Sequence, residues 1–164
     1  MDDLATEAGL SRSAMYFYFG SKEDVLIGLH QTIYEAMVDT MAPISVEGAP
    51  MAEAIGEAIQ RVCNNWRAHR YALRTFHETA MVSSSFGEIW RQRLEQHVDA
   101  MTLLIEREIV GGRAAPGPPS PRAIASSWFW MLEHQFYALF LGEHTVRDED
   151  ELVATLTVLW LRMI

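Results

Sequence analysis

Leu4-Ala-Thr-Glu-Ala-Gly-Leu-Ser-Arg-Ser-Ala-Met-Tyr-Phe-Tyr-Phe19 is the stretch that decides the fold of this chain, and Gly20-Ser-Lys-Glu-Asp-Val25 follows it at once. Gly9 can take the left-handed conformation that ends a helix, because it has no Cβ atom. Ser11 is a typical N-cap for the helix that follows. A glycine-centred turn between two short helices is the plan of a helix-turn-helix, whose second helix enters the DNA major groove. The turn by itself fits an ordinary helical hairpin of an all-α protein equally well.

The residues around the turn favour the first alternative. Ala8-Gly9, Ser11, Tyr16-Phe-Tyr-Phe19 and Ser21-Lys-Glu23 stand in this order at fixed spacing. This set resembles the signature of the TetR/AcrR family of transcriptional regulators, and the Tyr-Phe-Tyr-Phe run is similar to its ethionamide-resistance-repressor branch. The likeness continues more weakly over the rest of the chain. It implies an all-α, homodimeric repressor that binds operator DNA through a helix-turn-helix and binds a small ligand in a helical body.

Composition agrees with a folded helical protein of 164 residues, 49% of them hydrophobic. No apolar run reaches the ~20 residues that a membrane-spanning helix needs, so no membrane association is expected. Cys63 is the only cysteine, which fits a reducing cytoplasm and excludes an intrachain disulfide. No strand-like alternation is present, and the fold class is therefore expected to be all-α.

The charge balance is unfavourable for DNA binding, because duplex affinity comes largely from neutralised phosphates. The net charge is −9, and residues 1–30 carry two cations, Arg12 and Lys22, against five carboxylates. The family usually has a whole helix, often with a basic arm, before the point that corresponds to Met1. Three explanations stay open: the sequence is a fragment, its start lies at an internal methionine, or the protein has lost DNA binding. Operator DNA is thus an expected partner if that helix exists in the full protein.

The chain divides into a head and a body. The head covers residues 1–42 and includes a partial helix-turn-helix and a connecting helix that Ser21 caps. The body covers residues 43–164, where ligand binding and dimerisation are expected. Its first segment, 43–50, is predicted to be a loop because it is bounded by prolines. Further helices are predicted over 51–82 with a break near His69, over 86–110, over 121–142 and over 148–163; residues 111–119 form a proline-rich linker.

The last two predicted helices are apolar on more than one side, so both sides must be covered. In a domain of this size one side can face the core and the other a second subunit. The resemblance implies the same arrangement, a four-helix bundle of two subunits. A homodimer through these helices is therefore expected; the alternative is a helix buried inside one subunit.

The recognition helix is expected over 12–18, and six residues at or near it carry groups suited to phosphates and base edges. By resemblance, Tyr16, Tyr18 and Lys22 match positions that commonly contact the phosphate backbone. The two tyrosines could instead pack between head and body, and Phe17 and Phe19 are expected in the core. The predicted DNA-binding residues are Ser11, Arg12, Ser13, Tyr16, Tyr18 and Lys22.

Aromatic residues on several predicted helices face inward and are hard to interdigitate without leaving space. An aromatic cavity with few polar groups is the usual form of a small-molecule site. The resemblance implies a tunnel for elongated, mostly apolar ligands, with Phe129 and Leu132 standing where amide residues are expected. We therefore expect a small apolar or amphiphilic ligand; a plain packed core is the alternative. The predicted ligand-binding residues are Trp66, Phe76, Trp90, Leu94, Met101, Phe129, Leu132, Phe136 and Trp160.

The sequence gives no support for catalysis, a metal or a cofactor. Glu133 and His134 are adjacent and point ~100° apart on a helix, so they are no ready dyad. No histidine pair has a metal-binding spacing, and neither a glycine-rich phosphate loop nor a serine elbow is present. The resemblance to the TetR/AcrR family instead implies a ligand-responsive repressor of TetR type; the alternative is a ligand-binding or protein-interaction homodimer that has lost DNA binding.

Overall fold

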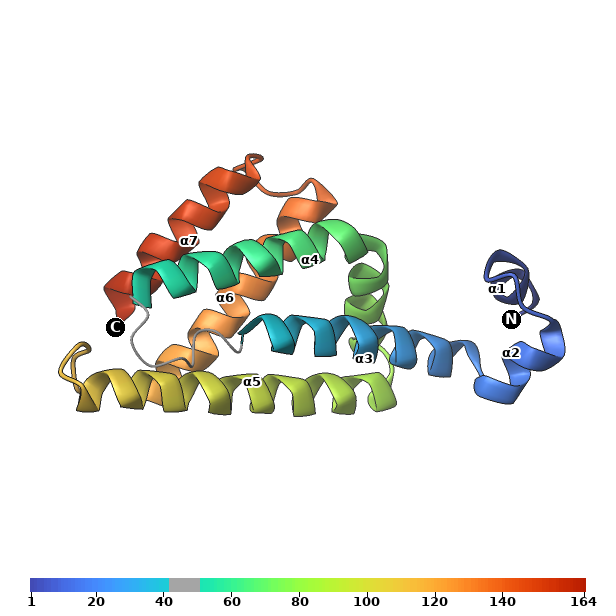
Figure 1. The fold of residues 1–164 in the computed structure, drawn as a ribbon, viewed down its shortest axis with the longest axis horizontal. Coiled ribbons are helices and arrows are strands. Elements are labelled where there is room, and N and C mark those ends of the chain that lie inside the picture. The colour runs from blue at the N-terminus through green and yellow to red at the C-terminus, as the bar shows by residue number, and fades with distance from the viewer. Residues whose placement is uncertain (42–50) are drawn as a thin grey trace.

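The computed structural model describes residues 1–41 and 51–164, and this part of the chain is all-α, as predicted (Figure 1). The expected loop over 43–50 lies outside the described residues. Seven helices are present there: α1 (Asp2–Glu7), α2 (Arg12–Tyr18), α3 (Lys22–Met41), α4 (Met51–Ala80), α5 (Ser84–Val110), α6 (Pro121–Leu141) and α7 (Glu149–Met163). None of the helices in the described part of the chain could span a lipid bilayer.

The helix-turn-helix forms as the local sequence dictates. Gly9 has φ +66°, the left-handed value that lets the chain turn after α1. The Ser11 hydroxyl accepts a hydrogen bond from the Ala14 amide at 3.1 Å and caps α2. Ala5 and Met15 are the buried side chains that join the two helices.

α3 joins this head to the body. Ser21 caps it, since its hydroxyl accepts a hydrogen bond from the Asp24 amide at 3.0 Å. α1 and α2 lie at one end of the molecule, apart from the helical body, and α3 runs from them into it (Figure 1). Phe19, just after α2, lies against Gly28 of α3, where an added Cβ would be 3.3 Å from the ring. The lack of a side chain at Gly28 therefore makes room for the ring that fixes the head on α3.

α4 bends where the sequence predicted a break. His69 has non-helical angles, φ −120° and ψ 17°, yet the helix continues beyond it to Ala80. The prediction of a second, shorter helix to residue 82 is thus replaced by one kinked helix. After the bend, the second half of α4 crosses the middle of α3, where Phe76 stacks on His30, and leads to the start of α5 (Figure 1).

The body closes around a core drawn from α4, α5, α6 and α7. α6 starts with the Ser120 cap and ends at Gly142, whose φ of +77° allows the turn toward α7. Side-chain ion pairs join the helices at the surface: Arg67 of α4 with Glu149 of α7, and Arg122 of α6 with Glu95 on α5. Surface pairs of this kind add little stability. Burial of apolar side chains is the main source of stability here.

Candidate functional site

The six predicted DNA-binding residues lie together on α2 and its two flanks, and all six are exposed. The Ser11 and Ser13 hydroxyls are hydrogen-bonded at 3.1 Å. Tyr16 and Tyr18 are 46% and 69% exposed, so neither is buried between head and body. Lys22 begins α3 beside them. The arrangement thus presents hydroxyl, phenol and ammonium groups on one small head, which is what contact with a phosphate backbone requires.

Arg12 is the one predicted contact residue that has an ion-pair partner among the described residues. Its Nε lies 3.2 Å from a carboxylate oxygen of Asp2, and its guanidinium lies 5.6 Å from the centre of the Tyr16 ring. Both members of the ion pair are well exposed, so water screens the attraction and the pair adds little stability.

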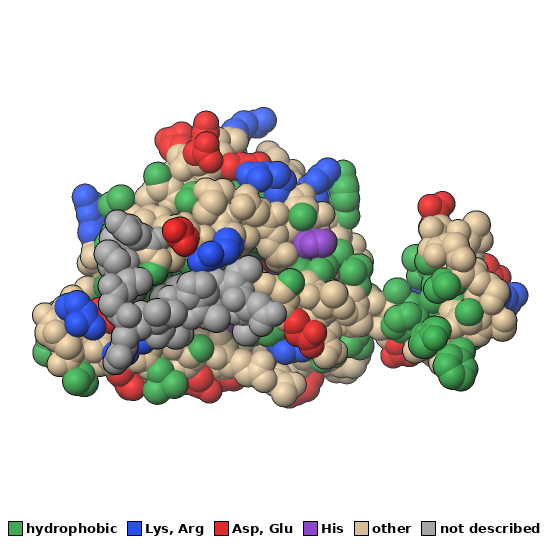
Figure 2. All heavy atoms as spheres, viewed as in Figure 1, with side chains coloured by type: hydrophobic (Ala, Val, Ile, Leu, Met, Phe, Trp, Pro, Cys, Tyr) green, Lys and Arg blue, Asp and Glu red, His purple; other side chains and the backbone are tan. Residues whose placement is uncertain are grey.

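The expectation that Phe17 belongs to the core is wrong. Its side chain is 82% exposed, with its ring edge-on to Tyr18 at 5.2 Å. The physical reason is that α2 packs against α1 along the side that carries Met15, and Phe17 lies on another side. Figure 2 shows the hydrophobic side chains that gather on the visible face of the head.

The body contains a partly enclosed, mostly apolar cavity between α3, α4, α5 and α6. Its free space is only about 30 Å³, room for one or two water molecules. A ligand of ordinary size therefore needs the lining to open. The lining consists of His30, Ile33, Tyr34, Asn65, Trp66, Leu73, Phe76, His77, Trp90, Arg93, Phe129 and Glu133.

Four of the nine predicted ligand-binding residues line this cavity: Trp66, Phe76, Trp90 and Phe129. The other five do not. Leu94 is half-buried against the core, and the remaining four are buried core residues. Their assignment to a ligand site stays a prediction. These four are Met101, Leu132, Phe136 and Trp160.

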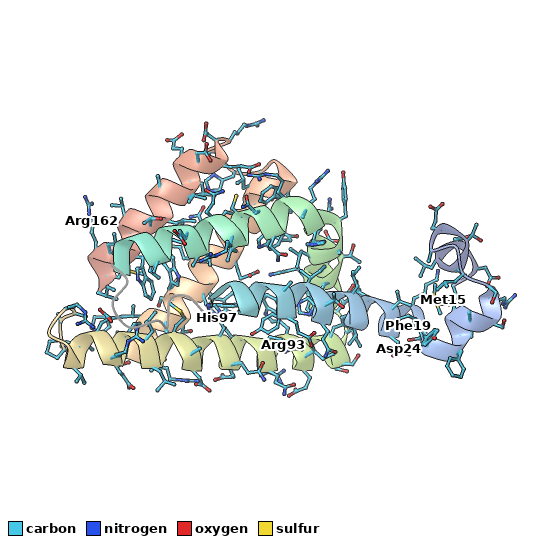
Figure 3. The ribbon with its side chains drawn as sticks, viewed as in Figure 1. Met15, Phe19, Asp24, Arg93, His97 and Arg162 are labelled. Carbon is cyan, nitrogen blue, oxygen red and sulfur yellow. The ribbon has the colours of Figure 1, made fainter. Side chains whose placement is uncertain are left out.

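Three polar residues of the lining, His30, Tyr34 and Arg93, are not among the residues that the sequence predicts for this site. His30 and Tyr34 come from α3, and Arg93 comes from α5 (Figure 3). The spacing of His30, Ile33 and Tyr34 is the helical i, i+3, i+4 pattern, which was available as a signal. Nothing in the sequence indicated that this side of α3 meets the cavity, because helix rotation depends on the packed neighbours.

Burial shifts the ionisation of several lining residues. The His30 ring stacks on Phe76 with 3.5 Å between ring centres, and burial together with nearby Arg93 lowers the pKa of His30 to about 4. Burial also raises the pKa of Glu133 to about 7. For His77, which lies 4.9 Å from both Trp90 and Tyr137, burial lowers the pKa. Near neutral pH the two histidines are uncharged, and Glu133 is close to half protonated.

A second hollow lies beside the bend of α4. It has about 110 Å³ of free space, and Trp66 belongs to its wall as well as to the wall of the inner cavity. Its other lining residues are Arg70, Tyr71, Arg74, Tyr137, Phe140 and Leu141.

No group of three or more histidine, cysteine and acidic residues within 1–41 and 51–164 is placed to hold a metal ion. The buried Cys63 thiol lies 3.5 Å from a carboxylate oxygen of Glu149. The pKa of the thiol is raised to about 12, mainly by burial and secondly by the nearby Glu149 carboxylate. Such a thiol is a poor nucleophile at neutral pH.

Comparison with known proteins accounts for both parts of the structure. Residues 55–164 match the model of the family "Transcriptional regulator EthR, C-terminal domain", and residues 1–29 match "Bacterial regulatory proteins, tetR family". The chain is 33% identical to an HTH-type transcriptional regulator EthR of Mycolicibacterium smegmatis over 166 residues. It is 27% identical over 169 residues to the EthR of Mycobacterium tuberculosis. Both alignments cover all of this chain and 76% of the relative.

A solved structure has a similar fold. It is a transcriptional regulator of the TetR/AcrR family from Thermobifida fusca, with a TM-score of 0.69 and 21% sequence identity. The similarity covers 98% of this chain and 84% of the other.

Proposed function

Because the chain belongs to the TetR family of bacterial transcriptional regulators, with a C-terminal domain of EthR type, we propose that it is a ligand-responsive repressor. In this proposal it leaves operator DNA when a small, largely apolar molecule occupies the helical body. The head covers residues 1–42, and the body covers residues 43–164. These families are families of regulators and not of enzymes.

One observation carries the proposal: α3 belongs to both parts. Phe19 of the head lies against Gly28, and two residues later His30 begins the stretch of α3 that lines the cavity. A ligand that displaces this stretch must also move the helix on which the head is fixed. The Phe19–Gly28 contact and the cavity wall thus lie on the same helix, so that a movement of one is expected to move the other.

The small size of the cavity suggests why ligand binding would weaken DNA binding rather than strengthen it. A drug-sized ligand occupies several hundred Å³, against the free space of about 30 Å³. The ligand therefore binds only a form in which the lining has opened. Selective binding to that form shifts the population toward it, and DNA binding weakens if the heads are then wrongly spaced.

A second subunit is part of the proposal. α6 and α7 leave large apolar side chains partly exposed, among them Trp130 at 45%, Val158 at 46% and Leu161 at 38%. Covering them with the same helices of a second copy makes a four-helix bundle. The dimer axis then places two heads in successive major grooves of a palindromic operator.

The test is fluorescence anisotropy with labelled DNA taken from upstream of the protein's own coding sequence. We expect saturable binding by the full-length protein, a steep loss of affinity with added salt, and competition by the same unlabelled sequence. Unrelated DNA of equal length is the control. Equal affinity for both DNAs, or no binding at low salt, would overturn the proposal.

A second candidate function is a ligand-binding homodimer without DNA activity. The observation in its favour is the acidic head, in which Arg12 is paired with Asp2 and only Lys22 remains as a cation. The anisotropy experiment separates the two functions. Ligand binding without any DNA binding would favour the second.

A further inference from the structure

Arg93 is a cation that faces an apolar cavity without an anion beside it. Its guanidinium lies 4.4 Å from the centre of the Tyr34 ring. Within residues 1–41 and 51–164 it forms no ion pair and no hydrogen bond. Arg91, two residues earlier on α5, shows the usual alternative, because it pairs with Glu88 at the surface.

The groups near Arg93 are mainly hydrogen-bond donors. Tyr34 contributes a phenol whose ring lies beneath the Arg93 guanidinium, and the pKa of this phenol responds to both Arg93 and Glu133, so both side chains are near it. The buried carboxyl group of Glu133 has no hydrogen-bond partner among the described residues, and burial keeps a large part of it protonated near neutral pH. A protonated carboxyl group is a donor.

The rest of the lining is mostly apolar and aromatic, and its other polar side chains are His30, Asn65 and His77. Trp66, Trp90 and Phe129 offer ring faces and no side-chain acceptor for the guanidinium. An occupant that fits this distribution has one anionic, planar acceptor at the end near Arg93 and an apolar remainder. Arginine binds a carboxylate through two parallel N–H···O bonds, and such charge-assisted bonds are strong when water is excluded.

We propose that Arg93 binds the carboxylate of an apolar carboxylic acid, whose body lies among the aromatic rings of the cavity. The inference rests on the proposed ligand site and names the class of molecule that it prefers. Tyr34 donates to the same carboxylate from α3, and Glu133 donates from α6. Binding thereby ties three helices, α3 included, to one ligand group.

The test compares acids with their esters. Octanoate and 4-phenylbutanoate are titrated against the intact protein, each beside its methyl ester, which keeps the shape and removes the charge. Quenching of tryptophan fluorescence reports occupancy, because Trp66 and Trp90 line the cavity. We expect each acid that fits to bind roughly tenfold or more tightly than its ester. The alkyl and aryl probes show which apolar body the rings accept.

Two variants of the same helix supply the control. Arg93→Gln is expected to lose the preference for the acid while it still binds the ester. Arg91→Gln removes the same charge from the exposed side of α5 and is expected to keep the preference. Arg93→Lys retains the charge without the fork of donors, and we expect it to keep part of the preference, which provides a folded variant if Arg93→Gln unfolds.

The outcomes separate the inference from the function on which it rests. Equal binding of acid and ester by the unmodified protein would overturn the inference and leave a ligand-responsive repressor standing. Retention of the full preference in Arg93→Gln would also overturn it. Quenching by neither class, together with DNA binding that no probe changes, would remove both the ligand site and the inference.

Discussion

Glu133 shows how burial in the cavity wall changes the pKa of a single residue. The side chain is 9% exposed, and burial disfavours its charged form, so its pKa rises to about 7. His30 is shifted in the opposite direction, to about 4, by burial and by the charge of Arg93. Both shifts favour uncharged groups in the cavity wall.

A pH-dependent gain in stability is expected for Glu133→Gln. The folded protein binds a proton at Glu133 more tightly than the unfolded chain does, so this residue costs stability as the pH rises from about 4.5 to about 7. The substitution removes that cost. Chemical denaturation should show a gain of roughly 2–4 kcal/mol at pH 8 and little change at pH 4.5. Glu106→Gln, on the exposed side of α5, is the control.

Lys22 gives a prediction for the DNA-binding surface. Lys22→Gln should weaken binding to every DNA sequence by a similar factor, roughly three- to tenfold, because a phosphate contact carries no sequence information. The slope of log affinity against log salt should fall by about one. Arg91→Gln removes an equal charge far from the head and should leave the slope unchanged. A loss confined to one DNA sequence would contradict the phosphate role.

At the scale of elements, the position of the kink in α4 and the limits of α2 could be predicted from the sequence. Ser11 and Gly9 act locally, and the irregularity near His69 is also local. Arg93 and His30 could not be assigned, because which side of a helix meets a cavity depends on how all neighbours rotate and pack. The prediction that Phe17 is buried was wrong for the same reason, because the sequence does not show which neighbours pack against each side of α2.

α3 depends on the small size of Gly28. A Cβ at this position would be 3.3 Å from the Phe19 ring, so Gly28→Val must push the ring and the attached head away. We expect a loss of DNA affinity of at least threefold, while ligand quenching in the body is unchanged. Circular dichroism checks that the helices persist.

Gly56→Ala supplies the comparison for this substitution. Its Cβ would lie 3.6 Å from Thr157, an ordinary contact within the body, and glycine is the weakest helix former apart from proline. This variant should be slightly more stable and bind DNA normally. Equal DNA affinity in both glycine variants would show that Phe19 does not transmit the position of α3.

At the scale of the whole molecule, the exposed apolar side chains of α6 and α7 lead us to predict a dimer that charged substitutions weaken. Val158 and Leu161 are one turn apart on α7 and partly exposed. Replacing both with glutamate should raise the dimer dissociation constant at least tenfold, as measured by light scattering after gel filtration, because buried unpaired charges are costly. Leu103→Glu on α5, which is 67% exposed, should leave the dimer intact. A dimer unaffected by the double substitution would place the interface elsewhere.

Because α3 connects the cavity to the head, a small tilt of α3 at the cavity produces a larger displacement of the head. From the cavity residue Ile33 to Lys22 the helix is eleven residues long, about 16 Å at 1.5 Å per residue. A tilt of about 10° at the cavity then carries the head about 3 Å sideways, close to the 3.4 Å spacing of stacked base pairs. In the proposed dimer, two heads that tilt in opposite senses change their separation by about twice that distance. We therefore expect a ligand that only loosens the aromatic wall to move both heads out of register with the grooves of a rigid duplex.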